Sequence, residues 1–304
     1  MKKKILILGG GISKEREISL NTARQVKNIL KKKYRILQSD LDKNFEHKLK
    51  SFKPDIVFNA LHGRFGEDGY VQTILEYNKI KYTHSGILSS ALAMDKIASK
   101  KKFIKNNILT PRFIKFKFNL ENKNSLKDKI KKKFKFPIVL KPINEGSSVD
   151  VYITNEKNLR KNLNKLKKYK EILIEEYIGG REIQAAILGK KKLGIIELRP
   201  RREFYDYKAK YDSKSKTEHI IPVDLSKKNL KKVLNIAFKA HKILKCRGVT
   251  RSDFKFFRNK FYLLELNTQP GMTELSLVPE IAAFKGISFF RLLEWILNDA
   301  SINR

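Results

Sequence analysis

The chain has 304 residues and carries 67 Lys and Arg against 31 Asp and Glu, a formal net charge of +36. A length of this order predicts about two or three domains with substantial cores. No run of 18 or more apolar residues occurs, and the apolar stretch at the start is too short for a signal peptide, so we expect a protein of the cytoplasm with no membrane partner.

The basic excess raises the question of a nucleic-acid partner. The lysines form short clusters along the whole chain, as in 31–33 and 129–133, among many Asn and Ile. This spread favours a compositional bias on exposed faces, and nucleic-acid binding is kept as an alternative. The single cysteine, Cys246, excludes an intrachain disulfide, and its neighbours predict a core residue.

A short apolar strand, Ile5–Leu8, is followed by three glycines and a helix through about Lys32. This order is typical of an open α/β domain that binds ligands at the carboxyl ends of its strands. A dinucleotide fingerprint fits only in part, because Lys14 takes the third glycine position and Glu15 would repel a pyrophosphate. Glu15 is placed to bind a cation such as an amine; the alternative is an acid that complements the helix dipole.

Two more strands are expected, near Tyr34–Leu37 and over Asp55–Leu61. The second leads into the glycine-rich loop His62–Gly69, and a helix over Tyr70–Asn78 follows. Because this loop starts at the carboxyl end of a strand, we expect His62 to face a site, with a core histidine as the alternative.

One helix is expected over Ser89–Lys105, and Thr110-Pro111 then interrupts the chain near a domain boundary. The lysine- and asparagine-rich stretch Phe118–Lys135 predicts a solvated helix with loops. The buried strand Phe136–Pro142 ends at a lysine, and the small-residue loop Glu145–Ser148 follows it. Backbone donors and hydroxyls in such a loop suit a phosphate.

A helix over Glu156–Lys168 and a strand over Glu171–Ile178 precede Gly179-Gly180, which predicts a hinge. Two strands, 183–189 and 193–199, lead to a polar segment, 200–222. A loop of this length is usually functional or disordered. Its interleaved tyrosines and lysines favour a lid that orders over a ligand.

After a helix over Lys228–Leu244, two alternating runs predict a β-hairpin, and a helix near Ile287–Leu297 ends the chain. A three-residue loop, Arg258–Lys260, would pair Asp253 with Glu265 and Arg251 with Asn267, all on one face.

Two carboxylates about 5 Å apart across a ladder repel by about 3 kcal/mol at an effective dielectric near 20. We therefore expect a cation between Asp253 and Glu265. Mg²⁺ suits such a pair, since it takes one or two carboxylates and completes its shell with water and phosphates. The alternative is a half-solvated hairpin whose charges point into water.

Eight motifs in one order carry a family resemblance. They are GGGISKEREISL, ALHGRFGEDG, MDK, VLKPINEGSSV, LIEEYIGGREI, FYDYKAKY, TRSDF and LLELNTQPGMTELSLVPE. From the first strand to beyond Leu277 the chain resembles the D-alanine–D-alanine ligases of the ATP-grasp superfamily. The resemblance implies an α/β and α+β ATP-grasp fold: a Rossmann-like open parallel-sheet domain over 1–85, then α+β domains over 86–178 and 179–304 that sandwich ATP, the last with a lid at 200–222.

The implied activity is the ATP-dependent ligation of two D-alanine molecules, through an acyl phosphate, for peptidoglycan precursor synthesis. The implied partners are ATP, two Mg²⁺ ions, for which Mn²⁺ may substitute, and a second copy of the chain in a homodimer. Residues assigned to ATP by the resemblance are Lys96, Lys141, Ser148, Glu175, Tyr177, Ile178 and Glu182. Residues assigned to the metal ions are Asp253, Glu265 and Asn267.

The resemblance also assigns the reacting groups. Glu15 would bind the ammonium of the first D-alanine, with His62 near its carboxyl group, and Arg251 and the backbone N–H of Gly271 would stabilise the oxyanion. Ser147 would align the second amine in a network with Tyr211 and Glu15. Lys210 and Ser276 would bind the carboxylate of the second D-alanine, and Leu277 would line the pocket.

Three positions depart from the family pattern. Asp150 stands where glycine is common, so its side chain must point away from ATP. Tyr177 replaces a tryptophan and Gln269 a serine. A D-alanine–D-lactate ligase is the alternative within the superfamily, and Tyr211 argues against it, because the depsipeptide-forming relatives resemble this motif with phenylalanine.

Overall fold

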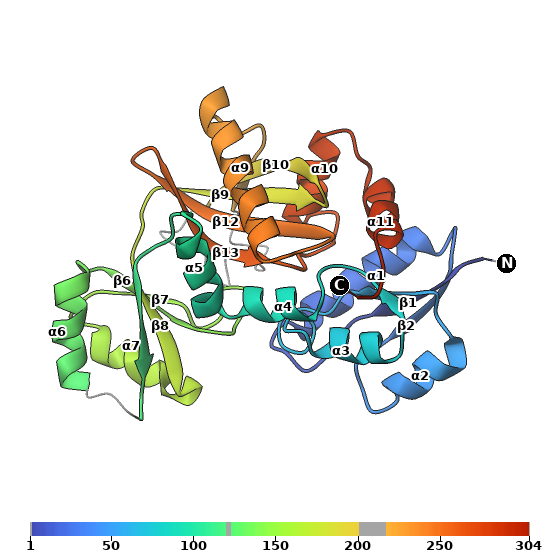
Figure 1. Cartoon of the computed structure of the whole chain (residues 1–304), viewed down its shortest axis with the longest axis horizontal. Helices are drawn as coiled ribbons and strands as arrows, with labels where there is room; N and C mark the ends of the chain where they lie inside the picture. Colours follow the sequence, from blue (N-terminus) through green and yellow to red (C-terminus); the bar gives the residue numbers. More distant parts are fainter. Residues whose placement is uncertain (1, 120–122, 201–216, 304) are drawn as a thin grey trace.

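The computed structural model describes residues 2–119, 123–200 and 217–303. They form three sheets, which follow one another along the chain and meet near the middle of the molecule (Figure 1). This mixture of one parallel and two antiparallel sheets with covering helices confirms the predicted α/β and α+β architecture. None of the described helices is both long and apolar enough to cross a membrane.

The first sheet is parallel, with strand order β2-β1-β3-β4. Along its strand β1, successive side chains face different helices. Ile5 and Ile7 pack on α1, whereas Leu6 and Leu8 pack on α2 and α3. Both faces are therefore buried, as expected for a parallel sheet. The elements are β1 (Lys4–Leu8), α1 (Arg16–Leu30), β2 (Arg35–Ser39), α2 (Phe45–Phe52), β3 (Ile56–Asn59), α3 (Tyr70–Tyr77) and β4 (Lys81–Tyr82).

The second sheet is antiparallel, with strand order β5-β8-β6-β7. Helices α6 and α7 cover one face, where Leu140 and Ile174 are buried. Because side chains alternate along a strand, their neighbours Lys141 and Glu175 point to the opposite face. The elements are β5 (Phe113–Lys117), α6 (Lys123–Lys133), β6 (Ile138–Pro142), β7 (Tyr152–Thr154), α7 (Leu159–Leu166), the 3₁₀ helix η1 (Lys167–Tyr169) and β8 (Glu171–Glu176).

The third sheet is also antiparallel, with strand order β11-β10-β9-β12-β13. On its central strand β9, Ile183, Ala185 and Ile187 pack with α9, whereas Ala186 and Leu188 pack with α10 and α11. The elements are β9 (Arg181–Leu188), β10 (Lys191–Arg199), β11 (Glu218–Ile220), α9 (Lys227–Ile243), β12 (Val249–Phe257), β13 (Lys260–Asn267), α10 (Leu277–Phe284) and α11 (Phe289–Asn298).

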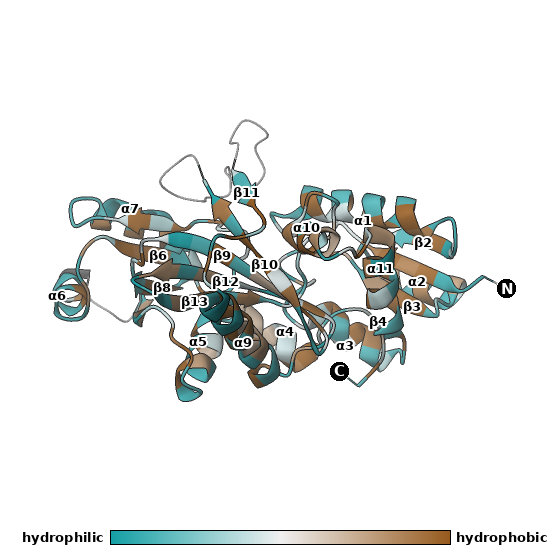
Figure 2. Ribbon diagram, turned by 90° about the horizontal axis from the view of Figure 1, so that it is seen from above, coloured by the Kyte–Doolittle hydropathy of each residue, from teal (hydrophilic) through white to brown (hydrophobic). Residues whose placement is uncertain are grey.

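The first and third sheets share one core. The apolar cluster that contains Ile5 and Val26 continues through Ile281 and Leu293 to Ile196 of the third sheet. Figure 2 shows α10 and α11 beside α1, between the two sheets. This shared core fixes the carboxyl ends of β1 and β3 next to the β12–β13 hairpin.

The predicted helix over Ser89–Lys105 is wrong in one respect: it is two helices, α4 (Ile87–Met94) and α5 (Lys96–Lys105). Asp95 separates them with ψ 101°, and its Oδ1 accepts hydrogen bonds from the backbone N–H of Ile97 at 2.8 Å and Ala98 at 2.9 Å. A side chain that caps the second helix ends the first.

The predicted hairpin loop is also wrong, although the predicted pairing is confirmed. The loop has two residues, Arg258 and Asn259, with φ of 48° and 59°, so it is the tight turn that twisted strands favour. A β-bulge leaves Leu264 without a partner in the ladder and shifts the register by one. The two differences cancel, and Asp253 pairs with Glu265.

Other expectations need smaller corrections. The Phe118–Lys135 helix is not wholly solvated, because α6 buries Leu126 and Ile130 in the second core.

The predicted lid, 200–222, ends in a strand, β11, and its residues 201–216, with Lys210 and Tyr211, lie outside the described part. The predictions omit α2, β4, β5, β7 and α10. Cys246 is buried, which raises the pKa of its thiol to about 12 and confirms it as a core residue.

We predict that Asp95→Ala lowers the free energy of unfolding by about 1 kcal/mol, because two backbone N–H groups of α5 lose their acceptor. Urea denaturation followed by circular dichroism measures this change. Asp95→Asn is the matched control, since its amide oxygen can still cap the helix. Equal stability of the alanine variant and the parent protein would contradict the capping role.

Candidate active site

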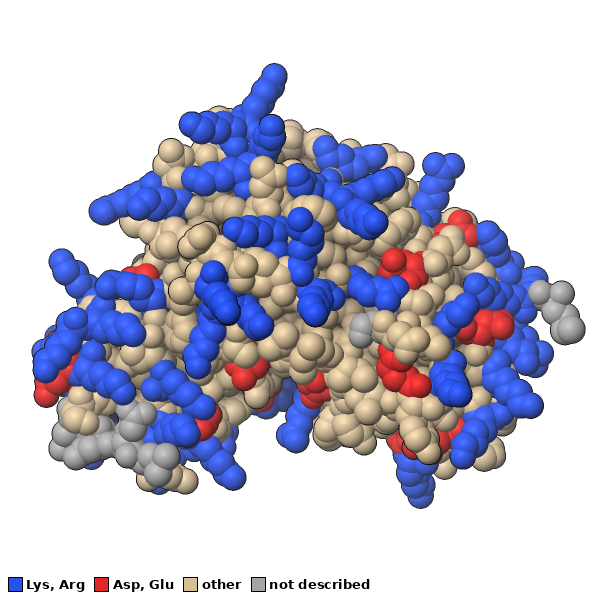
Figure 3. Space-filling view, in the orientation of Figure 1, with Lys and Arg blue, Asp and Glu red and all other residues tan. Residues whose placement is uncertain are grey.

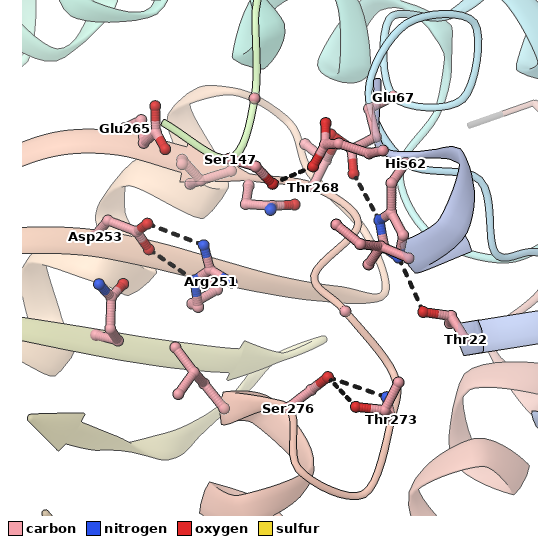
Figure 4. A pocket seen from close by; sticks show the side chains of 18 of the residues that line it. Thr22, His62, Glu67, Ser147, Arg251, Asp253, Glu265, Thr268, Thr273 and Ser276 are labelled. Atoms are coloured by element: carbon pink, nitrogen blue, oxygen red, sulfur yellow. Dashed lines mark hydrogen bonds and ion pairs between the residues drawn. The ribbon is translucent and has the colours of Figure 1, made fainter. Parts of the chain in front are cut away.

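A cavity of about 600 Å³ opens where the first and third sheets meet (Figure 4). Its wall combines the first half of α1, the loop after β3, the loop after β6, the β12–β13 hairpin and the start of α10. Of the residues singled out from the sequence, it brings together Glu15, His62, Lys96, Ser147, Arg251, Asp253, Glu265, Asn267, Gly271, Ser276 and Leu277.

A second cavity of about 90 Å³ lies between the second and third sheets. It adjoins the first, because Lys96, Asp253 and Glu265 line both. The residues that the resemblance assigns to ATP all line it: Lys96, Lys141, Ser148, Glu175, Tyr177, Ile178 and Glu182. The described residues among the sequence-based assignments therefore line one of two connected spaces.

Glu15 forms the wall of the large cavity nearest the first sheet. Its side chain accepts a short hydrogen bond from the hydroxyl of Ser147, which joins the start of α1 to the loop after β6 (Figure 4). A Cβ atom on Gly63 would come within 2.7 Å of Glu15 Oε2, and one on Gly146 within 2.9 Å. The two glycines thus make room for this carboxylate, which is 7% exposed and suited to a cationic ligand group.

His62 lies in the cavity wall but is itself buried. Its Nε2 is 3.1 Å from Thr22 Oγ1, and its Nδ1 is 3.3 Å from Glu67 Oε1. Burial raises the pKa of Glu67, and the charges of His62 and Arg251 only partly oppose that rise. Sequence reasoning missed both partners, Thr22 of α1 and Glu67 of the loop after β3.

The carboxylates of the hairpin are held by cations. Arg251 donates to both oxygens of Asp253, from Nε at 2.8 Å and from Nη2 at 2.9 Å. Lys96 Nζ lies 3.3 Å from Glu265 Oε2 and donates to the backbone oxygen of Glu145 at 2.5 Å. Arg251 and Lys96 thus supply part of the positive charge that we expect beside these opposed carboxylates.

The loop after β13 is shaped by its own hydrogen bonds. Asn267 Oδ1 accepts from the backbone N–H of Gln269 at 2.8 Å, and Ser276 Oγ accepts from that of Thr273 at 3.0 Å. The amide of Gln269 donates to the backbone oxygen of Leu61. The glutamine that departs from the family pattern therefore ties this loop to the end of β3.

Lys100, Lys141 and Glu175 form a buried ion cluster at the wall of the small cavity, which Lys141 and Glu175 line. Lys141 Nζ is 2.5 Å from Glu175 Oε1, and Lys100 Nζ is 2.9 Å from Glu175 Oε2. Burial would raise the pKa of Glu175, but the two lysines outweigh it and lower the pKa. Sequence reasoning missed Lys100, although it lies four residues after Lys96 and so on the same side of α5.

Asp150 points away from both cavities. Its φ of 55° is in the left-handed region that favours glycine. Its carboxylate is 3.2 Å from Lys14 Nζ and 2.9 Å from Lys168 Nζ, and it accepts a short hydrogen bond from Tyr169. Burial would raise the pKa of Asp150, but these donors lower it well below its ordinary value. The side chain thus connects the segment before α1 to the loop between β6 and β7 and to η1.

We predict that Asp150→Gly speeds amide hydrogen exchange in the neighbouring loop, residues 145–149. Glycine keeps the left-handed backbone, so the change removes the side-chain contacts to Lys14, Lys168, Tyr169 and Tyr152 without straining the chain. Mass spectrometry of peptic fragments measures the exchange. Asp150→Asn is the matched control, since asparagine tolerates this φ and accepts hydrogen bonds. Exchange at an unchanged rate in the glycine variant would rule out this connecting role.

Comparisons with known proteins agree with this arrangement. A family model described as "D-ala D-ala ligase C-terminus" matches residues 105–298. A D-alanine–D-alanine ligase of Pelagibacter ubique is 66% identical over 100% of both chains, and one of Wolbachia pipientis is 44% identical over 97% of this chain and 94% of its own.

Solved structures are also similar. The D-alanine–D-alanine ligase of Bacillus anthracis complexed with ATP has a TM-score of 0.84 and 33% identity, covering 98% of this chain and 97% of its own. The VanG D-Ala:D-Ser ligase of Enterococcus faecalis has a TM-score of 0.83 and 26% identity, covering 98% and 99%. With matched relatives over its full length and the same fold, the chain belongs to the D-alanine–D-alanine ligase family.

Proposed function

We propose that the protein joins two D-alanine molecules into D-alanyl-D-alanine with ATP, for use in peptidoglycan precursor synthesis. The observation that carries the proposal is the convergence of the family's motif residues from all three sheets on two connected cavities. Full-length similarity to enzymes of that name supports it. The small cavity would hold part of the nucleotide and the large one the two amino acids.

The chemistry needs two steps. A carboxylate oxygen of the first D-alanine attacks the γ-phosphorus of ATP, which forms an acyl phosphate and releases ADP. The amine of the second D-alanine then attacks the carbonyl carbon, and the tetrahedral intermediate expels phosphate and loses a proton. Both steps need charge neutralisation and positioning rather than a protein nucleophile.

The proposed roles follow the geometry. Glu15 would pair with the ammonium of the first D-alanine, and Arg251, beside Gly271 in the same cavity wall, would stabilise the oxyanion. Ser147, already bonded to Glu15, would orient the second amine. Ser276 at the start of α10 would bind the carboxylate of that substrate, and Leu277 would line the pocket. The family resemblance adds Lys210 and Tyr211, which lie outside the described residues.

Magnesium would be held by Asp253, Glu265 and Asn267, and Mn²⁺ could replace it. The donor set fits: two carboxylates face each other across the ladder, and Asn267 lies on the same cavity wall. Among the described residues no group of three His, Cys, Asp or Glu gathers, which suits a metal that takes only one or two carboxylates from protein. When bound, the ions would neutralise phosphate charge.

The remaining proposals concern organisation. We place domain boundaries near residues 85 and 178, because each of the resulting segments contains one sheet. Following the family resemblance, we propose a homodimer in the cytoplasm. Light scattering on the purified protein tests the dimer.

We predict that Glu265→Gln reduces ATP turnover by about a hundredfold or more, since it removes a metal-binding charge while keeping the shape of the side chain. Phosphate release with D-alanine and Mg²⁺ measures the effect. Glu294→Gln is the control, because Glu294 pairs with Lys33 on the surface, away from the cavities. Near-normal turnover by the Glu265 variant would refute the metal assignment.

The substrate itself is tested by offering D-alanine, L-alanine, D-lactate and D-serine separately as second substrate. We expect D-alanyl-D-alanine as the main product at neutral pH, measured by chromatography together with phosphate release. A larger yield of D-alanyl-D-lactate, or of the D-serine product, would overturn the choice of second substrate.

The nucleic-acid alternative has its own signature. It would be supported by tight, salt-sensitive RNA or DNA binding without ATP turnover stimulated by D-alanine. On the face shown in Figure 3, lysine and arginine side chains spread over the whole surface and form no single stripe, which favours the ligase.

A further inference from the structure

Lys100 is a fully buried lysine on α5, a helix that lies between the second and third sheets (Figure 1). Its exposed fraction is 0%. A buried ammonium group is costly unless it is paired and hydrogen-bonded. Lys100 meets that need with Glu175 Oε2 at 2.9 Å and Thr110 Oγ1 at 2.6 Å.

The contacts of Lys100 reach both sheets that enclose the small cavity. Glu175 is on β8 of the second sheet. Thr110 donates its hydroxyl proton to the backbone oxygen of Leu263 at 2.7 Å, two residues before Glu265 on β13 of the third sheet. Lys100 therefore lies at the junction of the strand assigned to the nucleotide and the strand assigned to the metal.

Glu175 lies between two lysines, of which only one lines the small cavity. Lys141 binds Oε1 and lines the small cavity, whereas Lys100 binds Oε2 from behind and does not line it. Burial lowers the pKa of Lys100 to about 8, with Glu175 opposing the decrease, so Lys100 carries its charge near neutral pH. Two lysines and one carboxylate leave this cluster with a net charge of +1.

That single charge matters because acids outnumber lysines among the residues that line the small cavity, in contrast to the basic chain as a whole. Among the described residues, three lysines and six acids line it. The lysines are Lys96, Lys141 and Lys255, and the acids are Glu145, Glu175, Glu176, Glu182, Asp253 and Glu265. These acids would repel a triphosphate that enters the cavity unless the nearby lysines are free to attract the phosphates.

We propose that Lys100 is a positioning residue for the nucleotide: by neutralising Glu175 from behind, it leaves the charge of Lys141 available to the phosphates. The inference rests on the proposed use of ATP. If Lys100 is made neutral, Glu175 cancels Lys141, and the cluster loses its net attraction for phosphate. If Glu175 is made neutral as well, Lys141 again contributes a full charge.

The test measures the Kd of Mg–ADP by calorimetry on the full chain. We expect Lys100→Met to weaken ADP binding by about tenfold, since one unit charge near the phosphates is lost. The double change Lys100→Met with Glu175→Gln is expected to bind ADP more tightly than Lys100→Met alone, because the cluster charge returns to +1. Glu175→Gln alone is the reference for the double variant, because Glu175 itself lines the small cavity. The KM for D-alanine should change much less than that for ATP.

Lys101→Met is the matched control, because Lys101 is exposed on the same helix. Circular dichroism checks folding of each variant. Lys100→Gln serves if the methionine variant does not fold, since glutamine can donate a hydrogen bond to Glu175 without a charge. If Lys100 acts only through packing, adding Glu175→Gln to a neutral Lys100 variant will not restore ADP binding.

The inference is overturned if the neutral Lys100 variants bind ADP within twofold of the parent, or if the double variant binds as weakly as the single one. Failure of the parent protein to bind ADP, or to form the dipeptide, would instead reject the proposed function. The two failures are therefore distinguishable.

Discussion

Opposed carboxylates that need cations are the constraint on which this site depends. Asp253 and Glu265 face each other across the β12–β13 ladder, where like charges destabilise a sheet. Arg251 satisfies the first carboxylate from the same strand, but Lys96, which contacts the second, comes from α5. The hairpin charges are therefore balanced only when α5 lies against the third sheet.

The same principle recurs at the other walls. Glu175 is balanced by Lys100 and Lys141, and Asp150 by Lys14 and Lys168. Lys96 and Lys100 come from α5, which lies outside the three sheets, and Lys14 precedes α1 of the first sheet. These ion pairs thus connect the segments that surround the two cavities, where the acidic side chains would otherwise concentrate negative charge. Divalent cations and a phosphate chain with its own lysine partners are the chemistry that suits such a space.

The hairpin shows how far a local pattern can be trusted. Alternation of polar and apolar residues predicted both strands, and the pairing of Asp253 with Glu265 was correct. The predicted loop was not, because the two-residue turn at Arg258 and Asn259 is offset by a bulge at Leu264. A bulge has little sequence signature when the extra residue is an ordinary leucine. Likewise, Asp95 reads as one more helical residue until its capping role is seen.

The sequence by itself determined most of the strands and helices, the pairing of Asp253 with Glu265 and the motifs that identify the family, because these depend on local periodicity and on residue types at close spacing. Only the tertiary structure decided which charges meet. Lys100 and Glu175 are 75 residues apart, and Lys14 and Asp150 are 136 apart, so their pairing follows from how three sheets pack. Burial then set their energetics, since the cost of an unpaired charge depends on its surroundings and not on its neighbours in sequence.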